Sequence, residues 1–175
     1  VATGILRQWH YLTDNSSTFR RVTLLERAYT NLVTSDDLSA WTAVGTPVVT
    51  AGISDPAGGT GAYTVADDDG AGAEHIYSAV TFTGDGVKAC VFVVKAATTP
   101  AGGVQFAVYD NTAAAMRYYI TVTFPAGVPS VTTTNGVTLG VRAIGNGFYA
   151  IYGQTTSVTA ANGHRVYVYP HDGIA

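Results

Sequence analysis

Charge is scarce in this sequence. Charged side chains make up 12% of its 175 residues, against roughly 25% in an average soluble protein. Nine Lys and Arg stand against twelve Asp and Glu, so the chain lacks the basic surplus with which proteins bind nucleic acid. The apolar fraction is 47% and the formal net charge is −3, which argues against intrinsic disorder. We therefore expect a folded domain without a nucleic-acid partner.

Cysteine and long apolar runs are also lacking. Cys90 is the single cysteine, so no disulfide can form within the chain. It lies in the apolar run 87–94, where we expect a small buried hydrophobic side chain and not a nucleophile. No apolar run approaches the about 20 residues of a membrane-spanning helix, so we expect no membrane insertion.

Glycine is abundant, and short segments rich in Val, Thr and Tyr alternate with Gly, Asn and Pro turns. The strongest turn signals are Asn135-Gly136, which predicts a hairpin, and Gly145-Asn146-Gly147, which precedes an aromatic strand. No fixed repeat occurs. The longer expected strands span residues 74–83, 87–96, 104–109, 116–124, 130–134, 137–144, 148–152 and 165–169, with shorter ones at 47–50 and 62–65. This spacing predicts an all-β fold, an antiparallel β-sandwich with jelly-roll topology, over residues 31–175.

Residues 1–30 differ in composition from the rest. They hold four of the nine basic residues, with aromatic side chains between them, and Asn15-Ser16-Ser17 predicts a turn. We interpret this stretch as an N-terminal arm or hairpin that packs on the main domain or on a neighbouring subunit. The alternative is a basic contact surface.

Five short segments carry a family resemblance together. They are LLERAYTNLV (24–33), SDDLSAW (35–41), DPAGGT (55–60), VFVVKA (91–96) and GNGFY (145–149). In order and spacing they resemble the carbohydrate-binding-module-like jelly-roll domains of phage tail and virion structural proteins. The resemblance covers the chain from Leu24 to about Asp172.

This resemblance implies a non-catalytic domain of a virion, located on the particle or outside the cell. It implies polysaccharide or cell-surface glycan as the ligand, and other virion subunits, further copies of the same chain included, as partners. It also implies a structural Ca²⁺ as a candidate cofactor. One alternative is a purely structural decoration or fibre domain that makes subunit contacts, and another is a glycoside hydrolase or lyase on the same fold.

The residues that could carry catalysis are few. Glycosidases need two carboxyl groups across a cleft, yet Glu26 and Glu74 are the only glutamates and most Asp residues lie in Gly-rich turns. Neither a Gly-x-Ser-x-Gly elbow nor a P-loop occurs. We therefore expect a protein that is not an enzyme.

Sugar binding needs flat aromatic rings and a few planar polar groups. The 11 Tyr, six Phe and two Trp supply the rings. Alternation along the expected strands places core-type residues such as Ile76 and Phe106 on one side and polar or aromatic residues on the other. The candidate ligand-binding residues that face outward are His75, Tyr77, Gln105, Tyr109, Arg117, Tyr119 and Tyr149. Together they would line one concave sheet, whereas the alternative for each Tyr is ordinary cross-strand packing.

The acidic turn Asp67-Asp68-Asp69-Gly70 offers carboxylate oxygens suited to Ca²⁺, although the EF-hand spacing is absent. Further candidate ligands are Asp36, Asp37 and Asp172. The alternative is a solvated acidic turn. The four histidines show no metal-ligand spacing.

Overall fold

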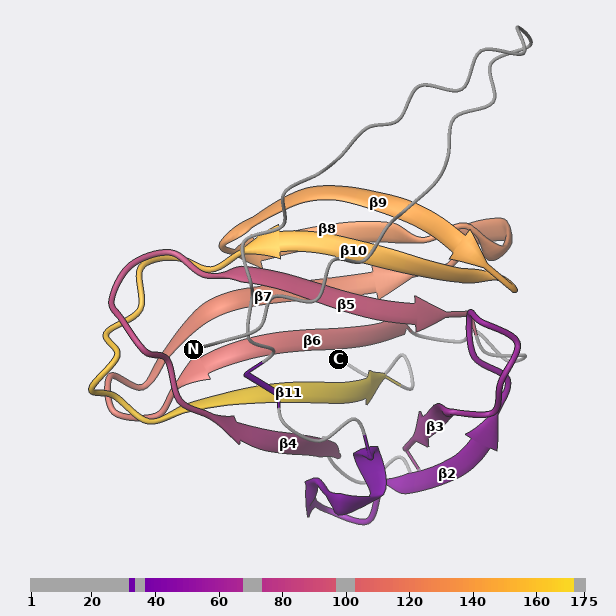
Figure 1. Ribbon diagram of the computed structural model, residues 1–175, viewed down its shortest axis with the longest axis horizontal. Coiled ribbons are helices and arrows are strands. Elements are labelled where there is room, and N and C mark those ends of the chain that lie inside the picture. The colour runs from indigo at the N-terminus through magenta and orange to yellow at the C-terminus, as the bar shows by residue number, and fades with distance from the viewer. Residues whose placement is uncertain (1–31, 34–36, 68–73, 97–102, 172–175) are drawn as a thin grey trace, which may run out of the picture. The chain divides into compact units, whose positions relative to one another are not determined.

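The computed structural model describes residues 32–33, 37–67, 74–96 and 103–171 (Figure 1). The chain divides into two units, Val1–Asn31 and Leu32–Ala175, and every described residue belongs to the second. The predicted arm, residues 1–30, lies outside the described residues, so its conformation stays a prediction.

Strands dominate the described part of the chain. They are β1 (Thr42–Val44), β2 (Val48–Ile53), β3 (Ala62–Ala66), β4 (His75–Val80), β5 (Ala89–Lys95), β6 (Gly103–Asp110), β7 (Ala115–Thr123), β8 (Ser130–Asn135), β9 (Val137–Gly145), β10 (Phe148–Gln154) and β11 (His164–His171). Two single-turn 3₁₀ helices, Leu38–Ala40 and Pro125–Gly127, complete the elements. Within the described ranges, the structure holds no helix with the length and hydropathy needed to cross a bilayer.

The strands form antiparallel sheets. A six-stranded sheet has the order β1-β4-β11-β6-β7-β8, a three-stranded sheet the order β5-β10-β9, and β2 and β3 pair by themselves. All pairs are antiparallel. The predicted all-β antiparallel β-sandwich is therefore confirmed, while its jelly-roll topology remains a prediction.

The core lies between the six-stranded and the three-stranded sheet. Phe92 of β5 stacks on Phe106 of β6 and on Tyr118 of β7, with ring centroids 4.6 and 5.9 Å apart. The buried cluster comprises Val80, Phe82, Phe106, Val108, Tyr118, Ile120, Val122, Ile151, Val158 and Val166. Because these residues alternate with outward ones along their strands, the inner face of each sheet is apolar. Cys90 packs against this cluster, and burial raises the pKa of its thiol to about 11, as expected for an unreactive side chain.

The two turn signals behave differently. Gly145-Asn146-Gly147 joins β9 to β10, with φ angles of 110°, 50° and 78°. Asn135-Gly136, by contrast, joins β8 of the six-stranded sheet to β9 of the three-stranded sheet, so the predicted hairpin at this point is wrong. The chain turns a corner here. Gly136 has φ 77°, and an added Cβ would overlap the Gln154 carbonyl and lie 2.6 Å from the Tyr118 ring.

Candidate functional site

Four neighbouring strands of the six-stranded sheet bring outward aromatic residues together. Tyr77 of β4 lies opposite Tyr167 of β11, and Tyr167 lies opposite Ala107 of β6. Ala107 in turn lies opposite Tyr119 of β7. This row of residues crosses the sheet on the side away from the core, because its members alternate with residues of the buried cluster such as Phe106 and Tyr118.

Two further rows flank the first. Tyr169 of β11 lies opposite Gln105 of β6, and Arg165 lies opposite Tyr109. Tyr119 donates a hydrogen bond from its hydroxyl to Gln105 Oε1 at 2.6 Å. We define the aromatic face by its residues His75, Tyr77, Gln105, Tyr109, Tyr119, Arg165, Tyr167 and Tyr169.

Tyr167 is the centre of the aromatic face. Its ring centroid lies 5.3 Å from that of Tyr77, 5.5 Å from that of Tyr169 and 6.1 Å from that of Tyr109. His75 completes the group, with its ring 4.7 Å from Tyr169 and 5.3 Å from Tyr167. These are ordinary distances for aromatic pairs, so each ring holds its neighbour in place.

The aromatic face is separate from the hydrophobic core. Tyr167 is only 7% exposed, yet it does not belong to the buried cluster between the sheets. The neighbouring rings are half-buried. Burial raises the pKa of Tyr169 to about 12, so its hydroxyl stays protonated and can donate hydrogen bonds at neutral pH. The face thus combines apolar ring surface with hydroxyl groups.

A cation is held against these rings. The Arg165 guanidinium carbon lies 4.2 Å from the Tyr77 ring centroid, and Nη1 donates to the Tyr167 hydroxyl at 3.3 Å. This hydrogen bond, together with the nearby tyrosines, raises the pKa of Arg165. The guanidinium is therefore charged and fixed in orientation by stacking and by one hydrogen bond.

The structure brings together five of the seven predicted residues, namely His75, Tyr77, Gln105, Tyr109 and Tyr119. Sequence reasoning missed Arg165, Tyr167 and Tyr169, because residues 165–169 were assigned only as a closing strand. The signal was present, since these three alternate with the apolar Val166 and Val168. Their position between β4 and β6 could not be derived from alternation.

Arg117 does not join the aromatic face, contrary to its predicted outward position. The β6–β7 pairing shifts register between Val108 and Tyr109, so alternation is interrupted where Arg117 lies. Its guanidinium instead pairs with Asp110 at 2.8 Å.

Tyr149 is also placed differently from the prediction. It lies on β10 in the three-stranded sheet, opposite Val94 of β5, and Val94 packs against the core. Residues opposite one another share a face, so Tyr149 points toward the inside of the sandwich. Tyr149 therefore lies in a different sheet from the other candidate residues.

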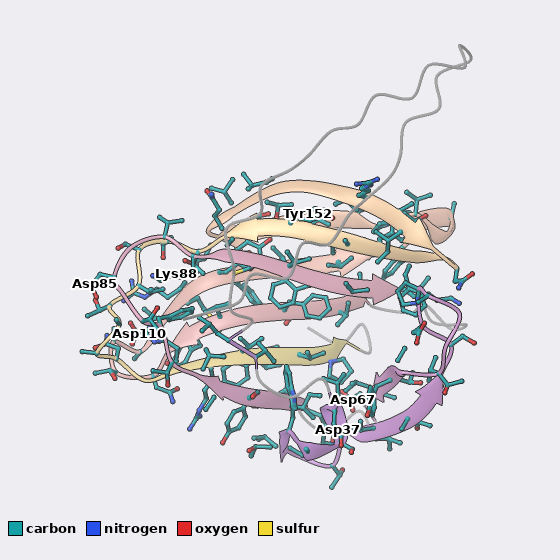
Figure 2. The ribbon with its side chains drawn as sticks, viewed as in Figure 1. Asp37, Asp67, Asp85, Lys88, Asp110 and Tyr152 are labelled. Carbon is teal, nitrogen blue, oxygen red and sulfur yellow. The ribbon has the colours of Figure 1, made fainter. Side chains whose placement is uncertain are left out.

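Asp110 is the centre of a second group of polar residues, at the end of β6 (Figure 2). Its fully buried carboxylate accepts hydrogen bonds from the Thr112 and Ala113 amides, from Asn162 and from Arg117. His164 Nε2 lies 3.5 Å away and is fully buried as well. Burial by itself would raise the pKa of Asp110, but these hydrogen bonds and His164 outweigh it and hold the pKa well below its usual range. The group links the β6–β7 turn to the start of β11.

The predicted calcium ligands are only partly covered by the structure. Asp67 is described (Figure 2), whereas Asp68, Asp69, Asp36 and Asp172 lie outside the described residues. Asp37 accepts hydrogen bonds from Ser39 and from the Tyr63 hydroxyl. In the part of the chain that the structure describes, no group of three or more His, Cys, Asp or Glu side chains could hold a metal ion. Calcium binding therefore stays a prediction.

No protein-family model matches this chain, and no curated protein sequence shows significant similarity to it. The resemblance to phage tail and virion domains accordingly remains a prediction from the five segments named above.

Proposed function

We propose that this protein is a non-catalytic carbohydrate-binding domain that recognises a glycan through the aromatic face. The observation that carries the proposal is the cluster of tyrosine rings on the outer side of a sheet, outside the core. Sugar rings present apolar C–H faces and hydroxyl edges, and the aromatic face offers both matching chemistries. Its rings supply apolar surface, and the Tyr119–Gln105 pair supplies hydroxyl and amide groups.

The proposal extends to the biological setting. On the strength of the resemblance, we infer a domain of a phage tail or other virion component that contacts a polysaccharide or a cell-surface glycan. Binding through one small face is weak, and several copies on one particle raise the apparent affinity without new contacts.

The experiment is a binding assay on immobilised polysaccharides and glycan arrays, with Tyr77→Ala and Tyr119→Ala as test variants. We expect each to weaken binding by about tenfold, which corresponds to about 1.4 kcal/mol. The matched control is Tyr152→Ala, because Tyr152 is an exposed tyrosine of the three-stranded sheet (Figure 2). The absence of binding to any polymer, or an equal loss in the control, would contradict the proposal.

A second candidate function is a structural virion domain that makes subunit contacts. It is favoured by the outer side of the three-stranded sheet, where Val91 and Val93 of β5 are 57% and 49% exposed. Tyr152 lies opposite Val91 and is exposed too. Exposed apolar patches of this kind often mark protein contacts. An obligate oligomer in light scattering that buries this side would favour the second candidate.

Catalysis is not part of the proposal. Within the described ranges Glu74 is the one glutamate, and its carboxylate accepts hydrogen bonds from the amide and hydroxyl of Thr46. Release of reducing ends from a bound polysaccharide would overturn this part of the proposal and favour a glycoside hydrolase.

A further inference from the structure

The aromatic face carries positive charge only, on Arg165. Among the described outward positions of β4, β11, β6 and β7, Arg165 is the one side chain with a formal charge, and the others are tyrosines, threonines, small residues, His75, Gln105 and Met116. No carboxylate within the described ranges forms an ion pair with Arg165. The chain as a whole carries a net charge of −3, so this cation stands on an otherwise acidic protein.

The guanidinium of Arg165 is prepared for a ligand. Its plane is held by the Tyr77 ring at 4.2 Å, and one N–H group is used by the Tyr167 hydroxyl. The remaining N–H groups form a planar fork whose geometry matches a carboxylate. Since stacking has already restricted the side chain, little rotamer entropy is lost when an anion binds.

We propose that the aromatic face binds an acidic glycan, one whose sugars carry carboxylate groups, and that Arg165 binds the carboxylate. This inference rests on the proposed function and specifies the class of its ligand. A neutral glycan that covered the aromatic face would remove water from the Arg165 cation without supplying a counter-charge, which is costly. A carboxylated glycan supplies the counter-charge and stacks on the rings at once.

A single cation on an acidic protein also disfavours densely charged polyanions. Such polymers are held by fields of many basic residues, and their binding falls steeply with salt. Recognition through one guanidinium fork and several rings suits a polymer of widely spaced carboxylates.

The test measures binding of the full chain to hyaluronan, which carries a carboxylate on every second sugar, and to polygalacturonate, alginate and polysialic acid, which carry one on every sugar, each beside its carboxyl-reduced counterpart. We expect at least one acidic polymer to bind at least about tenfold more tightly than its reduced form. Arg165→Gln should lower the affinity for that acidic polymer to about the level that the native protein shows for the reduced one. Arg165→Lys should give an intermediate affinity, because it keeps the charge and loses the fork. Arg142→Gln, an exposed arginine of the other sheet, is the matched control.

The outcomes separate the two proposals. If acidic and reduced polymers bind equally well and Tyr77→Ala weakens both, the proposal of an acidic ligand is overturned, whereas the proposal of glycan recognition is supported. Binding to no polymer of either kind would overturn both. Tighter binding of dextran sulfate than of every carboxylated polymer would also overturn the proposal that Arg165 binds a carboxylate. If Arg165→Gln lowers the melting temperature, the comparison of acidic with reduced polymers on the native protein still decides whether the ligand is acidic.

Discussion

At the scale of single residues, the backbone of Gly153 in β10 lies directly against the Tyr118 side chain of β7. A Cβ added to Gly153 would overlap the Tyr118 hydroxyl and the adjoining ring carbons. Tyr118 is fully buried, and its hydroxyl forms a hydrogen bond with Thr138 Oγ1 at 2.9 Å. An alanine at position 153 therefore fits only if the Tyr118 ring or β10 shifts.

We expect Gly153→Ala to lower the free energy of unfolding by about 1–3 kcal/mol, the usual range for an overpacked core. The measurement is chemical denaturation. Gly140→Ala is the matched control, because Gly140 has no atom within 4 Å of an added Cβ and lies in a neighbouring strand. The double variant with Tyr118→Phe should recover part of the loss, and a Gly153→Ala protein as stable as the native one would contradict this account.

Asp110 is the second residue on which the fold depends. Asp110→Ala would remove the partner of the Arg117 guanidinium and of the Asn162 side chain at once. We expect a loss of roughly 3 kcal/mol or more in the free energy of unfolding, because one charge of a paired group is left without its partner. Asp85→Ala offers a comparison, since Asp85 is exposed and accepts one hydrogen bond from the Ala160 amide. Equal effects of the two substitutions would contradict the special role of Asp110.

The lowered pKa of the Asp110 carboxylate predicts that the stability of the protein depends on pH. The pKa of Asp110 in the folded chain lies below its value in the unfolded chain. The carboxylate therefore makes its full contribution to the free energy of unfolding at any pH above the unfolded pKa, which is about 4. As pH falls below that value the unfolded chain binds the proton first, and the free energy of unfolding decreases. Between pH 5 and pH 2 the native protein should lose more stability than Asp110→Asn, measured by denaturation at each pH. Parallel curves for the two proteins would contradict the prediction.

At the scale of elements, the β9–β10 turn is tied to a distant loop. Asn146 donates from Nδ2 to the carbonyl oxygens of Asp55 and Pro56 at 3.1 and 3.3 Å. The Asp55 carboxylate in turn accepts from the Ala57, Gly59 and Gly61 amides and fixes the loop. A side-chain amide thus joins the three-stranded sheet to the segment between β2 and β3.

Asn146→Ala should destabilise the protein by about 1 kcal/mol or more, since it removes these hydrogen bonds and places alanine at a φ of 50°. Asn146→Gly loses the same hydrogen bonds but tolerates that φ, and we expect a smaller effect in thermal denaturation. A larger effect for glycine than for alanine would show that backbone strain is unimportant at this turn.

The elements themselves could be predicted from the sequence far better than their arrangement. Alternation and turn residues placed the expected strand 104–109 within β6 and the expected strand 87–96 around β5. The same local signals placed Arg117 wrongly, because a bulge in β7 interrupts the alternation there. They also predicted a hairpin at Asn135-Gly136, where the tight turn instead connects the two sheets. The aromatic face depends on β11 pairing with β4 and β6, and such distant pairing leaves no local trace in the sequence.

At the scale of the whole molecule, the two sheets of the sandwich present outer sides of different chemistry. One carries the aromatic face, and the other carries Val91, Val93 and Tyr152. We expect the double variant Val91→Thr with Val93→Thr to reduce self-association in light scattering without changing glycan binding, because threonine keeps the β-branched shape and adds a hydroxyl. Val128→Thr, at an exposed valine after β7, should leave association unchanged. A monomeric native protein would contradict this prediction.

The place of β11 in the six-stranded sheet has a consequence for how the protein is made. Synthesis from the N-terminus delivers β4 and β6 well before β11, which must then insert between them. Until it does, Tyr77 and Tyr109 lack their contacts with Tyr167. Two unpaired strand edges stay open to other nascent chains in the meantime, a known route to aggregation. A ribosome-bound chain that lacks residues 164–171 therefore has no assembled aromatic face, and we expect it to need a chaperone to stay in solution.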